Sequence, residues 1–205
     1  MTGADFVQIL DRALGELAKS RDELRDLDAA VGDGDLGLTI TSAAEGVRKA
    51  LLPLAREASP SLVLSAVGSA VLSANPSSFS ALSATGILAA AKCVAGLEAV
   101  SRDDIVRMGH EAARAISARG KCVVGDKTFL DPLVASVEAL EQSPDQPAFA
   151  VAITAARKAV KETSLLEAKR GRATWLGDRS RGHADPGAVA YVRLLESLQA
   201  AAGDE

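Results

Sequence analysis

The chain has 205 residues, of which 48% are hydrophobic but only 3% aromatic, so small aliphatic side chains must form its core, which favours closely packed helices. A formal net charge of -4, with lysines and arginines scattered apart from one late segment, argues against general nucleic-acid binding. The longest apolar stretches, near residues 62–74 and 81–98, are too interrupted to span a membrane, and the first residues lack the pattern of a signal peptide. We therefore expect a cytoplasmic protein folded as a single domain over residues 1–205.

Apolar residues recur at helical spacing along nearly the whole chain. A first amphipathic helix is predicted by a face made of Phe6, Ile9, Leu10, Ala13 and Leu17, and an acidic helix follows around residues 20–30. Further helices are predicted, in chain order, at residues 39–54, 61–74, 81–97, from 101 to about 120, from 128 onward, around 149–160 and from 186 onward. The sequence has no alternating strand pattern and no internal repeat, so it predicts an all-α fold.

Some of these helices have recognisable starts and faces. Ser101 and Asp104 have the spacing of a capping box, and Thr128 with Asp131 would form a second one. The two predicted helices between residues 61 and 97 are apolar on all sides, which predicts that they lie in the interior.

Residues 27–37 place three aspartates and three glycines between two predicted helices. Carboxylates as close in sequence as Asp28, Asp33 and Asp35 repel one another, raise one another's pKa, or recruit a cation. Mg²⁺ takes carboxylate oxygens together with phosphate oxygens and water, so these side chains are candidate ligands for one or two ions. The alternative is a solvated turn whose aspartates cap the next helix, and the spacing alone does not decide between the two.

Residues 119–128 combine two glycines and two lysines ahead of a predicted helix start. Free backbone N–H groups at a helix N-terminus attract phosphate, so an anion or ribose contact is one interpretation. Taken alone, the stretch fits a plain loop between helices better.

Residues 169–187 have no helical periodicity and contain five basic residues, several glycines and the only tryptophan. Arginine grips phosphate through two parallel N–H groups, and an aperiodic segment of about 20 residues is uncommon in a compact domain and usually functional. A functional interpretation is therefore favoured over a solvated basic loop. Trp175 is expected to pack the segment against the protein, and His183 to make a structural hydrogen bond.

Together, these stretches resemble a known family, the ADP-binding L subunit of dihydroxyacetone kinase, which also forms the C-terminal half of single-chain dihydroxyacetone kinases. The matching residues are Asp28, Gly32-Asp33-Gly34-Asp35 and Gly37, then Gly125-Asp126-Lys127-Thr128, then residues 171–180 and 182–187. The resemblance runs from about residue 5 to 202. It implies an eight-helix antiparallel up-and-down barrel with the nucleotide site in the loops at one end.

The resemblance also implies the chemistry of that site. Asp28, Asp33 and Asp35 would bind two Mg²⁺ ions that bridge the phosphates of ADP or ATP. The residues expected at the nucleotide are Leu36, Gly37, Leu38, Thr39, Ser77, Ser78, Gly120, Phe129, Arg172, Asp185, Pro186 and Gly187. Magnesium and an arginine would neutralise the charge that develops on the transferred phosphoryl group.

By this resemblance the chain is half of an enzyme. In the family, the histidine that holds the triose covalently belongs to a separate K subunit or domain, so we expect no catalytic residue for the sugar here and a kinase subunit that is active only with a K-type partner. The phosphoryl donor would be free ATP, or an M-type phosphocarrier of the phosphotransferase system that rephosphorylates bound ADP; a homodimer is one further assembly to consider. The alternatives are a non-catalytic nucleotide-binding regulator that contacts a transcription factor or a partner kinase subunit, and a helical scaffold that has lost the site.

Two places depart from the family pattern. Leu36 stands where the family usually has a histidine directly after the third aspartate, so an apolar side chain replaces a donor to phosphate. Residues 75–81 replace a glycine-rich loop, which leaves the hydroxyl groups of Ser77 and Ser78 to bond phosphate there. The sugar substrate, dihydroxyacetone or another ketose, is left open.

Overall fold

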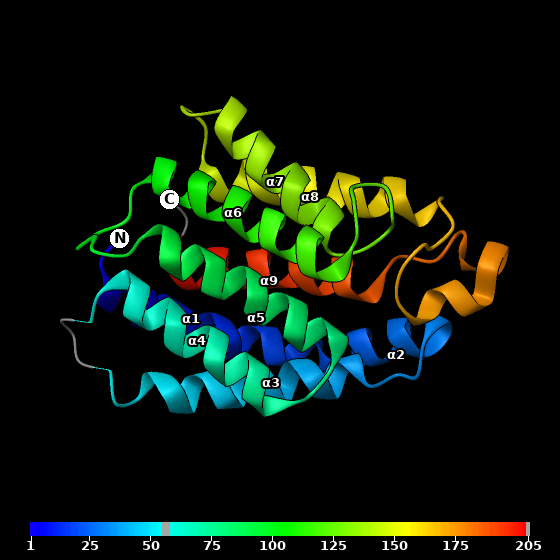
Figure 1. Cartoon of the computed structure of the whole chain (residues 1–205), viewed down its shortest axis with the longest axis horizontal. Helices are drawn as coiled ribbons and strands as arrows, with labels where there is room; N and C mark the ends of the chain where they lie inside the picture. Colours follow the sequence, from blue (N-terminus) through cyan, green and yellow to red (C-terminus); the bar gives the residue numbers. More distant parts are fainter. Residues whose placement is uncertain (55–57, 204–205) are drawn as a thin grey trace.

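The computed structural model describes residues 1–54 and 58–203, and this part of the chain is almost entirely helical (Figure 1). Within it lie nine α-helices, two 3₁₀ segments and no β-strand, which confirms the predicted all-α fold. The elements are, in chain order, α1 (Gly3–Leu17), η1 (Ala18–Ser20), α2 (Arg21–Val31), α3 (Leu36–Leu51), α4 (Pro60–Ala74), α5 (Ser78–Cys93), α6 (Arg102–Gly120), α7 (Leu130–Gln142), α8 (Ala148–Ser164), η2 (Arg172–Ser180) and α9 (Pro186–Ala202).

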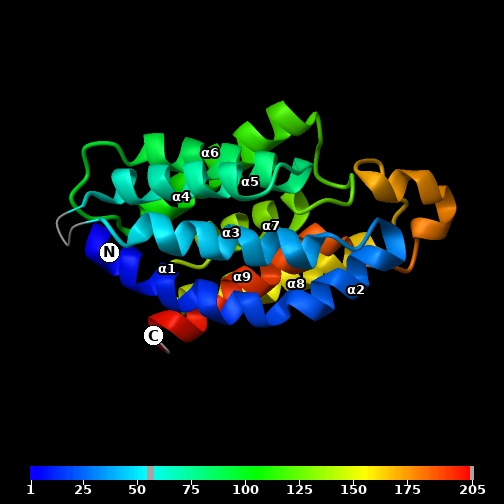
Figure 2. The same ribbon diagram turned by 90° about the horizontal axis from the view of Figure 1, so that it is seen from below.

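The helices run up and down in sequence order and close on themselves (Figures 1 and 2). Right-handed helical backbone angles at Leu17 and Ala18 carry α1 through η1 into α2, so residues 3–31 form one bent helical rod. With this rod counted once, the described residues form eight long helical segments, the number that the resemblance predicted. Each segment packs on the next one along the chain and α9 returns to α1, a closed order of neighbours that agrees with the expected barrel.

The up-and-down order gathers the connections at two ends of the molecule (Figure 1). The end on the right of Figure 1, called the site end below, holds residues 32–35, 75–77, 121–129 and 165–185. The opposite end, called the far end, holds the N-terminus, the end of α9, residues 94–101 and 143–147, and the described part of the connection between α3 and α4.

Aliphatic side chains from neighbouring helices form the core, as the composition predicts. The largest buried cluster joins the α1–α2 rod to α3, α4 and α9, and includes Leu17, Leu24, Ile40, Val47, Val63 and Ala190. A second cluster lies between α6 and α7 towards the site end and consists of Ile116, Cys122, Phe129, Leu130, Leu133 and Val137. None of the helices in the described ranges has the length and apolar character needed to cross a membrane.

Some helix boundaries and faces differ from the predictions. α3 begins at Leu36 and α5 at Ser78, each three residues before its predicted start, because loop residues without apolar periodicity join the first helical turn. The hydroxyl group of Ser77 caps α5 at this earlier position. The prediction that α4 is interior on all sides is wrong, since Leu62 and Leu72 are 52% and 47% exposed.

Of the two predicted capping boxes, one is confirmed. Ser101 and Asp104 form it at the start of α6. The second, between Thr128 and Asp131, is wrong, and α7 begins two residues later than predicted. The reason is that the carboxylate of Asp131 accepts the backbone N–H groups of Gly125 and Thr128, at 2.5 and 2.7 Å, and so holds the preceding loop.

Candidate functional site

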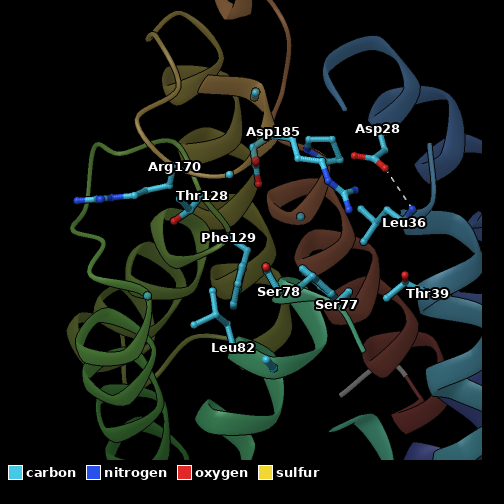
Figure 3. A pocket seen from close by; sticks show the side chains of 18 of the residues that line it. Asp28, Leu36, Thr39, Ser77, Ser78, Leu82, Thr128, Phe129, Arg170 and Asp185 are labelled. Carbon is cyan, nitrogen blue, oxygen red and sulfur yellow. Dashed lines mark hydrogen bonds between the residues drawn. The ribbon is translucent and has the colours of Figure 1, made fainter. Parts of the chain in front are cut away.

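A cavity of about 510 Å³ lies at the site end of the molecule (Figure 3). Its walls come from the ends of α2 and α6, the first turns of α3, α5 and α9, the loop at residues 121–129 and the segment at residues 165–185. One wall is acidic and another is apolar, and the lining includes three arginines, Arg119, Arg170 and Arg172.

The acidic wall is built around the turn from α2 to α3, with Asp28 near the end of α2, Asp35 at the start of α3 and Asp33 between them. One carboxylate oxygen from each of the three lies within 4.8 Å of the other two. Burial raises the pKa of Asp28 and the negative charges of the other two aspartates raise it further, while the backbone N–H of Leu36, 3.2 Å from Oδ2, favours the charged form (Figure 3). Three carboxylates at this separation are a donor set that fits a hard divalent cation such as Mg²⁺.

Two glycines allow this turn. Gly34 has a φ of +76°, in the left-handed region that favours glycine. Gly32 ends α2, and a Cβ atom there would lie 2.6 Å from Oδ1 of Asp28 and displace its carboxylate. Asp35 occupies the N-cap position of α3, but its side chain makes no capping hydrogen bond, and the carboxylate of Asp28 instead accepts the backbone N–H of Leu36, the first residue of that helix. Among the described residues, capping of the helix therefore accounts for one of the three aspartates.

Arg172 reaches the acidic wall from a distant part of the chain. Its guanidinium group donates a hydrogen bond to Asp33 and lies 3.5 Å from Oδ1 of Asp35. Gly171, just before it, has φ +70° and ψ −168°, angles that are nearly restricted to glycine, so the backbone turn that aims Arg172 depends on that residue. The side chains of this cluster are each about half exposed. A cationic side chain is thus already paired with two of the three carboxylates.

The apolar wall centres on Phe79 and Phe129, whose rings meet edge to face with 5.3 Å between their centroids. Leu82 and Cys122 extend this wall, and a Cβ atom at Gly120 would lie 3.1 Å from Sγ of Cys122, so glycine leaves the space open. Burial raises the pKa of the Cys122 thiol, which therefore stays neutral. A wall of this kind accommodates a flat heteroaromatic ring.

Three helix N-termini meet at the cavity, because the first residues of α3, α5 and α9 (Leu36, Ser78 and Pro186) all belong to its lining. Helix N-termini present free N–H groups and a partial positive charge, which attract anions. The side chain of Leu36 is only 6% exposed and packs in the core, so this position supplies a backbone donor to Asp28 in place of a polar side chain. Ser77 and Ser78 both belong to the lining, and the hydroxyl group of Ser77 is bonded to the backbone N–H and the hydroxyl of Ser80, each at 3.0 Å.

α9 starts at the cavity with Asp185, whose carboxylate caps the helix by accepting the backbone N–H three residues later, at 2.8 Å. Burial raises the pKa of Asp185 to about 7, and the negative charge of Asp131 adds to the effect. A Cβ atom at Gly187 would lie 3.3 Å from the ring of Phe79, so glycine lets the start of α9 pass close to the apolar wall.

Lys127 holds the segment at residues 165–185 against the rest of the site end. Its side chain is buried and its ammonium group donates to three carbonyl groups, those of Ser164, Leu166 and Ser180, at 3.3, 2.9 and 2.6 Å. Burial lowers the pKa of Lys127. The neighbouring Asp126 accepts a hydrogen bond from Arg170 at 3.1 Å, and although burial opposes its ionisation, the N–H donors around it lower its pKa. Residues 119–128, for which the sequence favoured a plain loop, therefore hold the segment that carries Arg172.

Most of the residues expected at the metal and the nucleotide belong to the cavity lining: Asp28, Asp35, Leu36, Thr39, Ser77, Ser78, Gly120, Phe129, Arg172, Asp185, Pro186 and Gly187. Asp33, Gly37 and Leu38 do not. Asp33 is engaged by Arg172, and the side chain of Leu38 is 54% exposed. Gly37 faces α2, where a Cβ atom would lie 2.2 Å from the backbone oxygen of Arg21, so its absence of a side chain serves helix packing. The ligand contacts of all these residues stay predictions.

The lining also contains residues that were not predicted as site residues: Val31, Phe79, Ala81, Leu82, Arg119, Cys122, Thr128, Arg170, Gly171 and Ala173. Phe79 and Leu82 lie three residues apart on α5, so helical spacing would have found them had the helix been started at Ser78. Arg119 and Cys122 carry no such signal, because the chain leaves the helical register between them.

Three expectations about residues 169–187 are wrong. Residues 172–180 were expected to lack secondary structure, but they form 3₁₀ turns with a break at Gly177. Trp175 does not pack the segment down, since it is 83% exposed. His183 is exposed, and in the described part of the chain its backbone N–H, not its ring, makes the hydrogen bond, to the carbonyl of Ser180.

Comparison with known proteins places the chain in a family. A family model for the DAK2 domain matches residues 30–200, a range that includes all the predicted site residues except Asp28. The chain belongs to the DAK2 domain family. This DAK2 chain is 31% identical to the ADP-binding subunit DhaL of the PEP-dependent dihydroxyacetone kinase of Escherichia coli, over 92% of each chain. It is 32% identical to the ADP-binding subunit DhaL of PEP-dependent dihydroxyacetone kinase 2 of Listeria innocua, over 97% of this chain and 94% of that one. The resemblance to the L subunit is thereby confirmed.

The DAK2 chain also resembles a solved structure, the dihydroxyacetone kinase of C. freundii in complex with AMP-PNP and Mg²⁺. The TM-score is 0.74 at 22% identity, and the match covers 97% of this chain and 34% of that one. The likeness supports the helical fold, and the DAK2 chain spans about a third of that protein.

Proposed function

We propose that this DAK2 chain is the nucleotide-binding subunit of a kinase of the dihydroxyacetone type, folded as a single domain and acting in the cytoplasm. It binds Mg-ADP or Mg-ATP and passes a phosphoryl group to a triose or related ketose that a separate K-type subunit holds covalently. The observation that carries the proposal is the layout of one cavity, in which three clustered carboxylates and an arginine lie at one part and an apolar wall at another. A nucleoside diphosphate has the same division into a charged and an aromatic part.

In this proposal Asp28, Asp33 and Asp35 hold the metal, and three carboxylates are enough to serve two ions that also take phosphate oxygens and water. Bound Mg²⁺ withdraws negative charge from the phosphate oxygens. Arg172 adds a planar pair of N–H donors to the same oxygens. Positioning and charge neutralisation of this kind account for most of the catalysis in phosphoryl transfer.

The other walls position the rest of the nucleotide. The N-termini of α3, α5 and α9 and the hydroxyl group of Ser78 offer further donors to phosphate, and Ser77, whose hydroxyl donates to Ser80, fixes the start of α5 beside them. Phe79 and Phe129 receive the base and exclude water from it. The hydroxyl of Thr39 is already bonded to the side-chain amide of Asn75, at 2.9 Å, and contributes to the wall between these regions.

A partner supplies the sugar. The relatives in E. coli and L. innocua are named as ADP-binding subunits of PEP-dependent kinases, which supports a division of labour between chains. We propose that a K-type subunit presents the sugar at the mouth of the cavity, and that an M-type phosphocarrier converts bound ADP back to ATP.

The first test removes one carboxylate. Asp33→Asn is expected to abolish Mg-dependent binding of ADP, measured by calorimetric titration, while circular dichroism reports unchanged helix content, because the acidic cluster repels itself and gives the fold little stability. Asp26→Asn is the matched control: it removes the same charge at the end of α2, where Asp26 pairs with Arg25 outside the cluster, and should leave binding intact. Binding of Mg-ADP by Asp33→Asn with wild-type affinity would sink the proposal.

The second test concerns the partner. The purified chain, incubated with ATP and dihydroxyacetone, is expected to form no sugar phosphate until a K-type subunit is added, and the product is measured by ³¹P NMR. The control is the K-type subunit alone with the same substrates. Turnover by the single chain would contradict the two-part division of labour.

A further inference from the structure

The guanidinium group of Arg172 has two possible partners, the aspartates and the phosphate groups. In the structure it pairs with Asp33 and lies 3.5 Å from Asp35, so its single positive charge partly offsets the charges of two of the three carboxylates that the proposed function assigns to Mg²⁺. The proposed function also assigns it to the phosphate groups. It cannot satisfy both at once, because a guanidinium held against Asp33 stands beside the place where a divalent cation would take the same oxygens, and two cations there repel each other.

We propose that Arg172 is a built-in competitor of the metal: it neutralises the aspartates before loading, and leaves them for the phosphate groups when Mg²⁺ and the nucleotide enter together. The inference rests on the proposed function, since it takes the three aspartates as the metal site. Before metal binds, the cation at this site is the guanidinium group of Arg172. Metal and nucleotide then favour each other's binding, because both draw Arg172 away from the aspartates.

The contacts around Arg172 suit such an exchange. Its side chain and that of Asp33 are each about half exposed, and ion pairs at this exposure are weak enough to exchange readily. Arg170 contrasts with it: its partner Asp126 is almost fully buried and lies away from the acidic cluster. The backbone on either side of Arg172 is held, by Lys127 at Ser180 and by Asp126 at Arg170. The exchange therefore needs only the long side chain to turn, with no refolding of the segment.

Removal of Arg172 changes the affinity for the metal ion in a direction that separates the two possible roles of this residue. A residue that only bound phosphate would leave the affinity for a metal ion alone unchanged when removed. A competitor, when removed, makes the metal bind more tightly in the absence of nucleotide and the nucleotide bind less tightly in the presence of metal. By reciprocity, the factor by which ADP increases the metal affinity should shrink in the same variant.

The experiment titrates the full chain with MnCl₂, which takes the same oxygen ligands as Mg²⁺ and is followed by the EPR signal of free Mn²⁺, first without and then with ADP. Arg172→Gln is expected to tighten Mn²⁺ binding without ADP by about fivefold, the upper range for an exposed ion pair, and to weaken Mn-ADP binding. Arg119→Gln is the matched control for loss of a positive charge from the same cavity lining, because it leaves intact the bond between Arg170 and Asp126 that holds the segment of Arg172, and it should tighten Mn²⁺ binding much less.

The result that overturns the inference is unchanged or weaker Mn²⁺ binding by Arg172→Gln without ADP, or equal tightening by Arg119→Gln, which would show that overall charge is the cause. Failure of the proposed function looks different. In that case the wild-type chain itself binds neither Mn²⁺ nor Mn-ADP, whereas a wild-type chain that binds Mn-ADP and an Arg172→Gln variant without the gain would remove this inference alone.

Discussion

The two ends of the molecule are closed in different ways. At the far end, capping boxes at the starts of α1 and α6 join residues three apart, and Arg102 caps the end of α7 by donating to the carbonyl groups of Leu140, Ser143 and Gln146. At the site end, the pairs that shape the cavity join residues 36, 53 and 139 positions apart: Asn75 with Thr39, Lys127 with Ser180, and Arg172 with Asp33.

Their acids differ as well. At the far end, the backbone N–H and hydroxyl of Ser101, together with Arg107, lower the pKa of Asp104 to about 2. At the site end, burial raises the pKa of Asp185 to about 7. Asp104 is thus held by contacts that stabilise its charge, whereas Asp28 and Asp185, which line the cavity, lie in places that disfavour theirs. Such places are typical of functional sites, because unsatisfied charge is what a ligand can neutralise.

The contrast between the two ends is tested most strongly by removing the ammonium group of Lys127. Lys127→Met removes the donor from three carbonyl groups and is expected to lower the free energy of unfolding by about 3 kcal/mol, since buried hydrogen bonds to charged groups are each of order 1.5–3 kcal/mol. It should also weaken Mg-ADP binding. Lys121→Met is a close control, because Lys121 has a similar left-handed backbone but is exposed. Urea unfolding measures the stability, and calorimetric titration measures the Mg-ADP affinity. Full Mg-ADP affinity in a destabilised Lys127→Met would show that the cavity does not depend on the hydrogen bonds of Lys127.

A smaller effect is expected from the far end. Ser101→Ala removes one half of the capping box of α6 and should cost about 1 kcal/mol of stability. Mg-ADP affinity should stay unchanged, because this cap lies at the end opposite the cavity. Ser73→Ala, an exposed serine within α4, should change stability by less than about 0.5 kcal/mol and serves as the control in the same urea experiment. Loss of nucleotide binding in Ser101→Ala would show that the two ends are coupled.

The stability of the chain is also expected to depend on pH. The pKa of Asp185 is raised in the folded state, so between about pH 4 and 7 the folded chain retains a proton that the unfolded chain releases, and the contribution of this group to stability falls as pH rises through that window. Asp104 has the opposite sign, and its contribution is lost as pH falls from about 4 towards 2. Asp185→Asn should therefore remove the decline between pH 4 and 7, as measured by urea unfolding. The same slope in both proteins would assign the decline to another group.

The features that sequence predicts well are those with a local cause. The helices follow from apolar spacing, the cap at Ser101 from a pattern three residues long, and the acidic cluster from three aspartates within eight residues of one another. A functional role for residues 169–187 was expected from their composition, but the assignment of Arg172 and of the start of α9 to the nucleotide came through resemblance to a family. Neither spacing nor composition relates Arg172 to Asp33, because their contact depends on how α2, α3 and η2 come together.

The features that the sequence did not predict depend on contacts between residues that are far apart in the chain. Lys127 looks like a surface lysine in sequence, and its burial depends on carbonyl groups contributed by residues 164–180. Trp175 was expected to pack its segment against the protein, yet the segment is held by polar bonds on either side of that residue. Nonlocal polar contacts leave no periodic trace in the chain, which is why the helices were easier to place than the walls of the cavity.

Trp175 gives the chain an optical property. It is the only tryptophan, it is 83% exposed, and it lies on η2, three residues after Arg172. Indole emission shifts with the polarity around the ring, and no second indole in the chain contributes a background. The fluorescence of the unlabelled protein is therefore a local reporter of the segment that carries Arg172, and the arrival of a ligand or a partner subunit on that segment can be followed in real time without any added dye.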